Sequence, residues 1–438
     1  MKYTILTFGC RVNQADSLGF EEDLLTCGAE AVPPEDADLV IVNTCSVTAS
    51  ADQAARQAIR RLSRINPSAR IVVTGCYATR RADEVRDLPN VSRVIPNEDK
   101  PRLVALTVGR PSPRRDDGLR PAHDETTTAE RFGSGDGGCG SVVEPGVAGR
   151  TAYTLRVQTG CAQPCSYCII PMTRGEPRSV PLIRVLDEVR QVRAAGFKEI
   201  ALTGVHLGSY GRDLRPALSL TDLLVALASG ADAACDGSPL FRISSLEPMD
   251  CTADIVGLVE RSRCFAPHFH LPLQHASDCV LAAMRRPYTL DYYAGLVDSI
   301  RSRIPHASIG SDVIVGFPSE SEDDFERLAS YLECSPLTHV HVFPYSDRPG
   351  TRAAAMKGRV PGVIVRERAR RLREISQRLS QRFRERQIGT VHQALTLEDG
   401  ALAVTGNYLK LRIPPGRTRN EWVKVRMISE HDGELLGG

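Results

Sequence analysis

The chain has 438 residues, 42% of them hydrophobic, and carries 55 Lys and Arg against 53 Asp and Glu. This length exceeds one compact domain, so two or three are expected, and the near-neutral charge neither requires nor excludes a polyanionic partner. The 13 cysteines are spread along the chain, unlike those of small disulfide-rich modules, and favour metal or redox chemistry in a reducing compartment. Because no apolar run approaches the roughly 18 residues that cross a bilayer, we expect a cytoplasmic protein with no membrane segment.

Short β-branched runs alternate with helical segments over residues 1–108, which predicts an N-terminal domain built on a parallel α/β sheet. Strands are expected at 3–8, 38–42, 70–74 and 91–95, with a helix at 49–64. Residues 109–150 are rich in Gly, Pro, Asp and Thr and lack apolar periodicity, so they are expected to form a flexible linker. Cys139 lies in this linker and is interpreted as incidental.

Strand and helix patterns alternate again over residues 151–365. Six strands are expected, at 154–157, 199–203, 241–245, 268–273, 308–315 and 339–343. Six parallel strands with helices between them predict a partial (β/α)6 barrel, smaller than the eight-stranded form.

The C-terminal part of the chain is basic. Residues 366–386, with nine Arg and three Glu, are expected to form a helix, and 387–438 a small all-β domain. Basic side chains and an exposed aromatic ring on such a unit suit phosphate contact and base stacking. The residues expected to contact RNA are Arg382, Arg384, Tyr408, Lys410 and Arg412. The alternative is a solvated helix face on which Arg and Glu pair with each other.

Three cysteines with C-x3-C-x2-C spacing, Cys161, Cys165 and Cys168, closely follow the first barrel strand. Three thiolates at this spacing can bind three irons of a cubane cluster and leave the fourth iron open. A loop at the carboxyl end of a barrel strand also lies at the usual active face. The alternatives are a zinc site with a distant fourth ligand, or three unrelated thiols.

A second set of cysteines, Cys10, Cys45 and Cys76, follows three predicted strands of the N-terminal sheet within three residues. Parallel strands end at the same edge of a sheet, so these thiols are expected to converge and to hold a second cluster. Taken singly, each would be interpreted as a small buried apolar residue. The other seven cysteines share no spacing.

The segment CAQPCSYCIIP resembles the cluster motif of radical S-adenosylmethionine enzymes. Together with GCRVNQADS, NTCSVT and TGCYA, it makes nearly the whole chain, apart from 109–150, similar to the methylthiotransferase family. This resemblance implies an N-terminal cluster domain, a partial radical S-adenosylmethionine barrel and a C-terminal TRAM-like domain. GCRVNQ and HVFPYSDRPGT most resemble the branch that acts on N6-threonylcarbamoyladenosine in tRNA. Branches that modify isopentenyladenosine or a ribosomal-protein aspartate, or a non-catalytic RNA-binding iron–sulfur protein, are the alternatives.

The resemblance also implies the cofactors and the reaction. Two 4Fe–4S clusters and S-adenosylmethionine are expected: the barrel cluster yields a radical that takes hydrogen from C2 of the adenine at tRNA position 37, and the N-terminal cluster handles the methylthio group. A reductant such as flavodoxin or ferredoxin is expected, whereas the sulfur donor is not identified.

By the same resemblance, residues at the carboxyl ends of barrel strands are expected to bind S-adenosylmethionine. They are Tyr167, Thr203, Gly204, Ser244, Glu247, Gln274 and Asp312. The chain departs from the family pattern at Gln163-Pro164 and His275-Ala276, which affects the expected substrate fit rather than the cysteine ligands.

Overall fold

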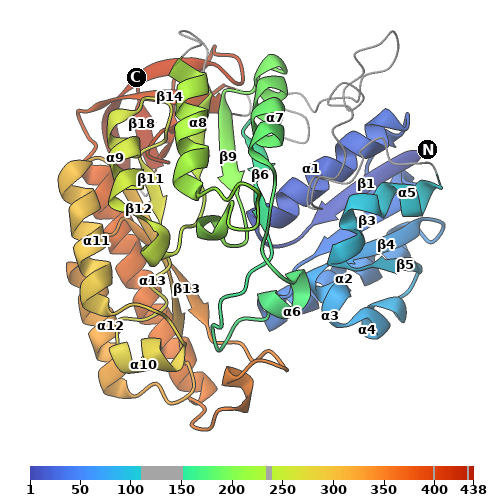
Figure 1. The fold of residues 1–438 in the computed structure, drawn as a ribbon, viewed down its shortest axis with the longest axis horizontal. Coiled ribbons are helices and arrows are strands. Elements are labelled where there is room, and N and C mark those ends of the chain that lie inside the picture. Colours follow the sequence, from blue (N-terminus) through green and yellow to red (C-terminus); the bar gives the residue numbers. More distant parts are fainter. Residues whose placement is uncertain (110–150, 233–238, 398–399, 432–433) are drawn as a thin grey trace.

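The computed structural model describes residues 1–109, 151–232, 239–397, 400–431 and 434–438. Figure 1 shows the N-terminal sheet with its helices beside a larger body in which helices surround strands, and the C-terminal strands lie near the start of that body's strands. The predicted linker, apart from Gly109, and Cys139 lie outside the described residues. No described helix is long and apolar enough to cross a bilayer.

The N-terminal part is a five-stranded parallel sheet of order β2-β1-β3-β4-β5. Its strands are β1 (Lys2–Thr7), β2 (Glu30–Ala31), β3 (Leu39–Thr44), β4 (Arg70–Gly75) and β5 (Val91–Ile95). Its helices are α1 (Arg11–Thr26), α2 (Ala49–Ile65), α3 (Cys76–Arg80), α4 (Ala82–Arg86) and α5 (Leu103–Val108). Every residue of the central strand β3 is buried, as expected for a parallel sheet covered on both faces. The predicted sheet is confirmed, and the two-residue edge strand β2 was too short to be predicted.

Six parallel strands form the second body. They are β6 (Tyr153–Arg156), β9 (Glu199–Thr203), β10 (Leu240–Ile243), β11 (His268–His270), β12 (Ser308–Val315) and β13 (His339–Pro344). They form two three-stranded sheets, of order β10-β9-β6 and β11-β12-β13. Parallel bridges from Phe241 to Phe265 and from Ser245 to His270 connect the two sheets. The predicted partial barrel is therefore confirmed.

Helices alternate with these strands and cover the outside of the barrel (Figure 1). They are α7 (Leu182–Ala194), α8 (Leu220–Asp232), α9 (Ala253–Arg261), α11 (Leu290–Arg303) and α12 (Glu322–Cys334). The short helix α6 (Ile170–Arg174) lies beside α3 of the N-terminal domain, and the short helix α10 (Asp278–Ala283) lies between β11 and α11. Several helices start where a hydroxyl accepts a hydrogen bond from a first-turn backbone N–H, as at Thr252, Thr289 and Ser321.

The barrel strands are apolar on one face and polar on the other. Residues of one parity, such as Leu202, Phe241 and Ile309, pack into the main hydrophobic core beneath the helices. Residues of the other parity face the barrel interior and include Arg242, His268, His270, Asp312, His339 and His341. Because parallel strands are usually apolar on both faces, a polar interior indicates a binding chamber rather than a packed core. We call this space the barrel interior.

The C-terminal part consists of α13 (Gly362–Glu385) and a closed barrel of order β14-β15-β16-β18-β17. The strands are β14 (Val391–Leu397), β15 (Leu402–Thr405), β16 (Lys410–Arg412), β17 (Trp422–His431) and β18 (Glu434–Gly437). The predicted helix and small all-β unit are present. The helix starts directly after Pro361, earlier than expected, because proline's fixed φ suits the residue that precedes a first turn.

A buried carboxylate joins the N-terminal sheet to the barrel. The Asp16 side chain on α1 is 0% exposed and forms ion pairs with Lys100 at 2.6 Å, Arg174 at 3.2 Å and Arg156. Burial by itself would raise the pKa of Asp16, but Lys100, Arg174 and Arg156 hold it well below its usual value. Since Asp16 and Lys100 belong to the sheet domain and the two arginines to the barrel, this charge cluster fixes how the two dock.

Replacing Asp16 with Asn is expected to lower the free energy of unfolding by about 3–5 kcal/mol at neutral pH, because three buried cations lose their carboxylate. Below about pH 4 the unfolded aspartate takes up a proton while the folded one stays ionised, so the difference between natural chain and variant should shrink by about 1.4 kcal/mol per pH unit. Urea unfolding at several pH values measures both effects, with Asp83→Asn, whose carboxylate is 94% exposed, as the control. A difference that does not change with pH would contradict the ionised state of Asp16.

Candidate metal centres and cofactor site

The first cysteine triad lies at the carboxyl edge of the N-terminal sheet, after β1, β3 and β4. Cys45 and Cys76 are buried, whereas Cys10 is exposed. Gly9 has a left-handed φ of +91°, and a Cβ atom there would lie 2.6 Å from Cys45 Sγ, so the loop after β1 lies directly against this thiol. Burial raises the pKa of Cys45 to about 11, and the nearby Cys10 and Cys76 thiols add to the rise. The structure therefore brings the three predicted ligands together.

Cationic side chains surround Cys76. Burial alone would raise the pKa of the Cys76 thiol, but Arg174 and Lys100 lower it, and Asn97 Nδ2 donates a hydrogen bond to Sγ at 3.7 Å. Iron–sulfur ligands are thiolates, so a buried triad needs positive charge nearby. These residues supply it, and the triad fits an anionic iron–sulfur cluster.

Arg174 connects the two triads. It ends α6, only six residues after Cys168, and its positive charge lowers the pKa of the Cys76 thiol. Six residues of largely helical chain advance on the order of 10 Å. The loop that carries the second triad therefore extends to the first.

The second triad occupies the loop between β7 (Gln158–Thr159) and α6, and all three cysteines are partly exposed. Arg286 Nη1 donates to Cys165 Sγ at 3.1 Å. Burial raises the pKa of Cys168 to about 12, and the Cys165 and Cys161 thiols add to the rise. Burial alone would lower the pKa of His206, but its hydrogen bonds to Asp250 and Cys161 raise it to about 9. This triad too has cationic donors beside its sulfur atoms, as a thiolate-bound cluster requires.

Three residues expected to bind S-adenosylmethionine lie at the carboxyl ends of β9 and β10. Thr203 ends β9, and Gly204 follows it so closely against Gln158 that a Cβ atom would lie 3.0 Å from Gln158 Oε1. Ser244 follows β10, and its buried hydroxyl has no hydrogen-bond partner among the described residues. Because a buried hydroxyl without a partner is unfavourable, Ser244 fits a position that a polar ligand satisfies.

Three further residues of this set are distinguished by their contacts or their backbone conformation. Glu247 forms an ion pair with Arg286, the same guanidinium that contacts Cys165. Gln274 has a left-handed φ of +67°, which is unusual for a side chain of this kind and typical of functional sites. Tyr167, within the cysteine loop, packs against a small cluster that includes Ile314 and Phe317.

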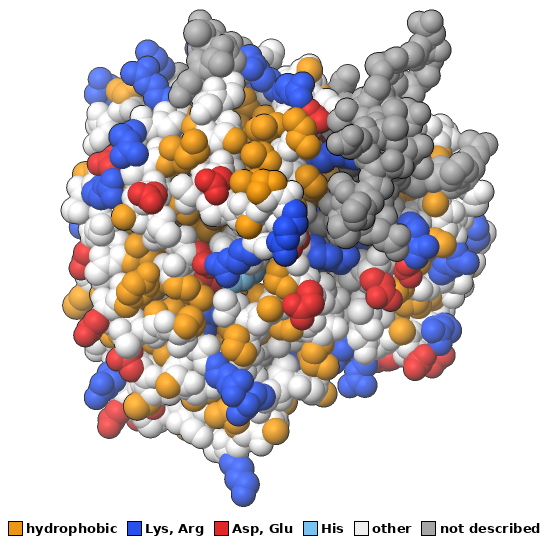
Figure 2. All heavy atoms as spheres, viewed as in Figure 1, with side chains coloured by type: hydrophobic (Ala, Val, Ile, Leu, Met, Phe, Trp, Pro, Cys, Tyr) orange, Lys and Arg blue, Asp and Glu red, His pale blue; other side chains and the backbone are white. Residues whose placement is uncertain are grey.

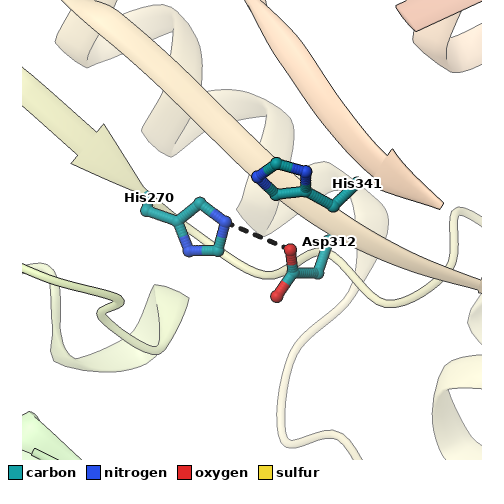
Figure 3. Close-up of side chains that lie close together, drawn as sticks. All are labelled: His270, Asp312 and His341. Atoms are coloured by element: carbon teal, nitrogen blue, oxygen red, sulfur yellow. Dashed lines mark hydrogen bonds and ion pairs between the residues drawn. The ribbon is translucent and has the colours of Figure 1, made fainter. Parts of the chain in front are cut away.

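Asp312 lies in the middle of β12 rather than at its carboxyl end, which corrects its expected position. The strand continues to Val315 because it pairs with β13 along that length. Asp312 therefore projects into the barrel interior beside His270 and His341 from the neighbouring strands (Figure 3). Its Oδ1 lies 3.1 Å from His270 Nε2, and His270 Nδ1 lies 3.1 Å from Ser245 Oγ.

The two histidines of this group were missed in the sequence. The ligand-type atoms of His270, Asp312 and His341 all lie within 4.8 Å of one another, although about 70 residues separate the first from the last. They share no short motif, and only the strand alternation and the pairing of β11, β12 and β13 bring them together. The group can donate and accept hydrogen bonds on a ligand inside the barrel.

The arginines expected to contact RNA are engaged within the protein. Arg382 donates to the Glu333 and Ser335 carbonyls, Arg384 pairs with Glu430, and Arg412 pairs with Glu434. Other arginines of α13 form ion pairs too, namely Arg368, Arg370, Arg371 and Arg378. This favours the alternative interpretation for the helix, a face on which Arg and Glu pair. On the face shown in Figure 2, Lys and Arg are scattered among Asp and Glu.

The remaining two residues of the RNA set lie on the C-terminal barrel. Lys410 is exposed on β16. Tyr408 is 46% exposed, and its hydroxyl accepts a hydrogen bond from Arg11 of the N-terminal domain at 3.0 Å. The RNA-contacting role of all five residues stays a prediction.

Arg174 and Arg286 offer a matched test of the two triads. If each triad holds a cluster, Arg174→Met should lower the reduction potential of the N-terminal cluster by about 60 mV or more, because it removes a cation that acts on Cys76. Arg286→Met should do the same to the barrel cluster only. Redox titration followed by electron paramagnetic resonance measures both potentials, and Arg174→Lys, which keeps the charge, is the control. Equal shifts of both clusters in either variant would contradict the assignment.

The N-terminal domain and the barrel each match a known protein family. Residues 2–96 match the uncharacterized protein family UPF0004, and residues 155–332 match the radical SAM superfamily. The threonylcarbamoyladenosine tRNA methylthiotransferase MtaB of Aquifex aeolicus is 36% identical over 94% of this chain and 96% of its own length. The protein of that name from Bacillus subtilis is 33% identical over 86% and 80%. The tRNA-2-methylthio-N(6)-dimethylallyladenosine synthase of Carboxydothermus hydrogenoformans is 33% identical over 90% and 87%.

Among solved structures, the fold is similar to that of the radical S-adenosylmethionine methyltransferase TsrM from Kitasatospora setae with cobalamin and a [4Fe-4S] cluster bound. The TM-score is 0.57 at 14% sequence identity, over 81% of this chain and 76% of that one. This likeness concerns the fold alone. Because the curated relatives match nearly the full length at 30% identity or more, the chain belongs to the radical S-adenosylmethionine methylthiotransferase family, whose cofactors are S-adenosylmethionine and 4Fe–4S iron–sulfur clusters.

Proposed function

We propose that this chain methylthiolates C2 of N6-threonylcarbamoyladenosine at tRNA position 37, next to the anticodon, with S-adenosylmethionine and two 4Fe–4S clusters. The proposal is supported by Arg174, which follows Cys168 by six residues and whose positive charge lowers the pKa of the Cys76 thiol. On this proposal, the site that would make the radical and the site that would handle sulfur are neighbours. The named substrate of the Aquifex aeolicus and Bacillus subtilis relatives supports the choice of base.

The bound cofactors would supply the radical that removes hydrogen from C2 and the methylthio group that replaces it, because C2–H is not acidic enough for acid–base groups. The protein's own residues bind and orient. Cys161, Cys165 and Cys168 would hold one cluster, and Cys10, Cys45 and Cys76 the other. Thr203, Gly204, Ser244, Glu247 and Gln274 would bind S-adenosylmethionine, with Tyr167 near its adenine.

Two arginines would keep the clusters and their surroundings in place. Arg286 contacts both Cys165 and Glu247, so it ties the barrel cluster to the cofactor site. Arg174 offsets the thiolate charge at Cys76 and is itself held by Asp16. Inside the barrel, the His270–Asp312 hydrogen bond fixes the orientation of both side chains toward the substrate base.

The partners follow from the same proposal. The tRNA anticodon stem-loop would contact the small C-terminal barrel, a TRAM-like domain, through Lys410 and Tyr408. The paired arginines Arg382, Arg384 and Arg412 would have to exchange their protein partners for phosphates to take part. Electrons would come from a reductant such as flavodoxin or ferredoxin, and we expect the protein to act in the cytoplasm.

The other candidate substrate is isopentenyladenosine in tRNA, because the Carboxydothermus hydrogenoformans relative, named for the dimethylallyl compound, is about as similar as the Bacillus subtilis one. Anaerobic assays with anticodon stem-loops that carry either base distinguish the two. The proposal expects methylthio product from the threonylcarbamoyl RNA, and product from the isopentenyl RNA alone would contradict it. A non-catalytic RNA-binding protein would release no 5′-deoxyadenosine with either RNA.

Two cysteine substitutions separate the proposed roles of the clusters. Cys161→Ala should abolish 5′-deoxyadenosine formation, because the barrel cluster then lacks a ligand. Cys45→Ala should leave that cleavage in place and abolish methylthio transfer. Reconstituted protein, liquid chromatography of 5′-deoxyadenosine and mass spectrometry of the RNA nucleosides measure both, with Cys334→Ala at an exposed cysteine as control. Methylthio product from the Cys45 variant would refute the role of the N-terminal triad.

A further inference from the structure

The C-terminal domain contributes to the wall of the barrel interior. The turn between β15 and β16 lies across the amino-terminal end of the barrel strands. Asn407 Nδ2 donates to the His306 carbonyl, just before β12, at 2.9 Å, and Arg242 Nη1 donates to the Gly406 carbonyl at 2.9 Å. A Cβ atom on Gly406 would lie 3.2 Å from Pro267, just before β11. This close docking places Tyr408 at the edge of the interior.

Side chains from the N-terminal domain and from the barrel lie against the Tyr408 ring of the C-terminal domain. The Arg242 guanidinium carbon lies 4.5 Å from the ring centroid, and that of Arg11 lies 5.8 Å from it. The His268 ring centroid lies 5.0 Å away. Arg11 Nη2 also donates to the Tyr408 hydroxyl at 3.0 Å. Tyr408 thus holds the Arg11 guanidinium in a defined place.

The two arginines differ in charge balance. Arg242 is fully buried and forms a two-point ion pair with Glu199, at 2.9 and 3.2 Å. Arg11 is only partly buried, and no Asp or Glu of the described residues forms an ion pair with it. Burial lowers the pKa of His268 well below its usual value, and the nearby charges of Arg242, His339, His270 and Arg11 lower it further. Among the described residues, Arg11 is thus a positive charge at this end of the interior without an acidic partner, and an anion is the complementary ligand.

We propose that Arg11 determines substrate specificity by binding the carboxylate of the N6 substituent of the substrate base, and that Tyr408 positions its guanidinium. The inference rests on the proposed function, because a threonylcarbamoyl group ends in a carboxylate whereas an isopentenyl group is an uncharged hydrocarbon. A guanidinium matches a planar carboxylate with two parallel hydrogen bonds. Arg11 also directly follows Cys10, so a base held through this residue is next to the proposed N-terminal cluster.

A phosphate of the RNA backbone is the other source of an anion, and the test distinguishes the two. Two anticodon stem-loops are compared, one with the threonylcarbamoyl acid and one with its uncharged methyl ester. For the reconstituted holoenzyme, methylthiolation kcat/KM and, without S-adenosylmethionine, the RNA dissociation constant are measured on both. The natural chain should prefer the acid by about 10- to 100-fold, the usual strength of a hydrogen-bonded charge pair.

Arg11→Gln should abolish this preference by losing activity and affinity on the acid while its values on the ester change little. Arg11→Lys should restore part of the preference, and Tyr408→Phe, which keeps the ring and removes the acceptor, should reduce it severalfold. Arg327→Gln, at an exposed position of α12, is the matched control. Iron content and RNA-independent formation of 5′-deoxyadenosine confirm that each variant holds its clusters.

An equal loss on acid and ester in Arg11→Gln would overturn the inference in favour of a phosphate contact. Equal kcat/KM values of the natural chain on the two RNAs would overturn it as well, while leaving the proposed function standing. The natural chain could instead form no methylthio product from the threonylcarbamoyl stem-loop and form product from an isopentenyladenosine stem-loop. That result would overturn the proposed function and the inference with it.

Discussion

One buried carboxylate determines how the parts of this molecule fit together. Asp16 lies between a lysine of its own domain and two arginines of the barrel, and a charge this deeply buried is tolerated only with such partners. The contact does more than join two domains, because Arg174 extends from it to Cys76, and the helix that carries Asp16 begins with Arg11. The docking of the N-terminal sheet on the barrel therefore also sets the relative positions of the two cysteine triads and of the Arg11 guanidinium, which is proposed to bind the substrate.

Much of the fold could be predicted because its signals are local. The β-branched runs at β3, β9 and β12 and the change to alternation after α13 indicated each part of the chain, with bounds within a few residues of those observed. The convergence of Cys10, Cys45 and Cys76 was also predictable, since parallel strands end at one edge of a sheet.

Other features depend on contacts between distant segments, which a pattern in one stretch of sequence does not reveal. The His270, Asp312 and His341 group arises from the register of three strands. The Arg-rich sequence of α13 indicated a basic RNA-binding face, but its arginines form ion pairs with glutamates of α12 that are about 45 residues earlier in the chain. Tyr408 was predicted to stack on RNA from its type and neighbours, whereas its contact with Arg11 spans 397 residues.

The reaction proposed for this chain is formation of the methylthio derivative of N6-threonylcarbamoyladenosine in tRNA. Mass spectrometry of the tRNA nucleosides from a strain that lacks the gene tests it most directly, because one measurement fixes both the substrate and the reaction. We expect that the methylthiolated nucleoside disappears, that N6-threonylcarbamoyladenosine without the methylthio group accumulates, and that the natural chain, but not Cys45→Ala, restores the product. A strain that keeps this nucleoside and loses only the methylthio derivative of isopentenyladenosine would contradict it.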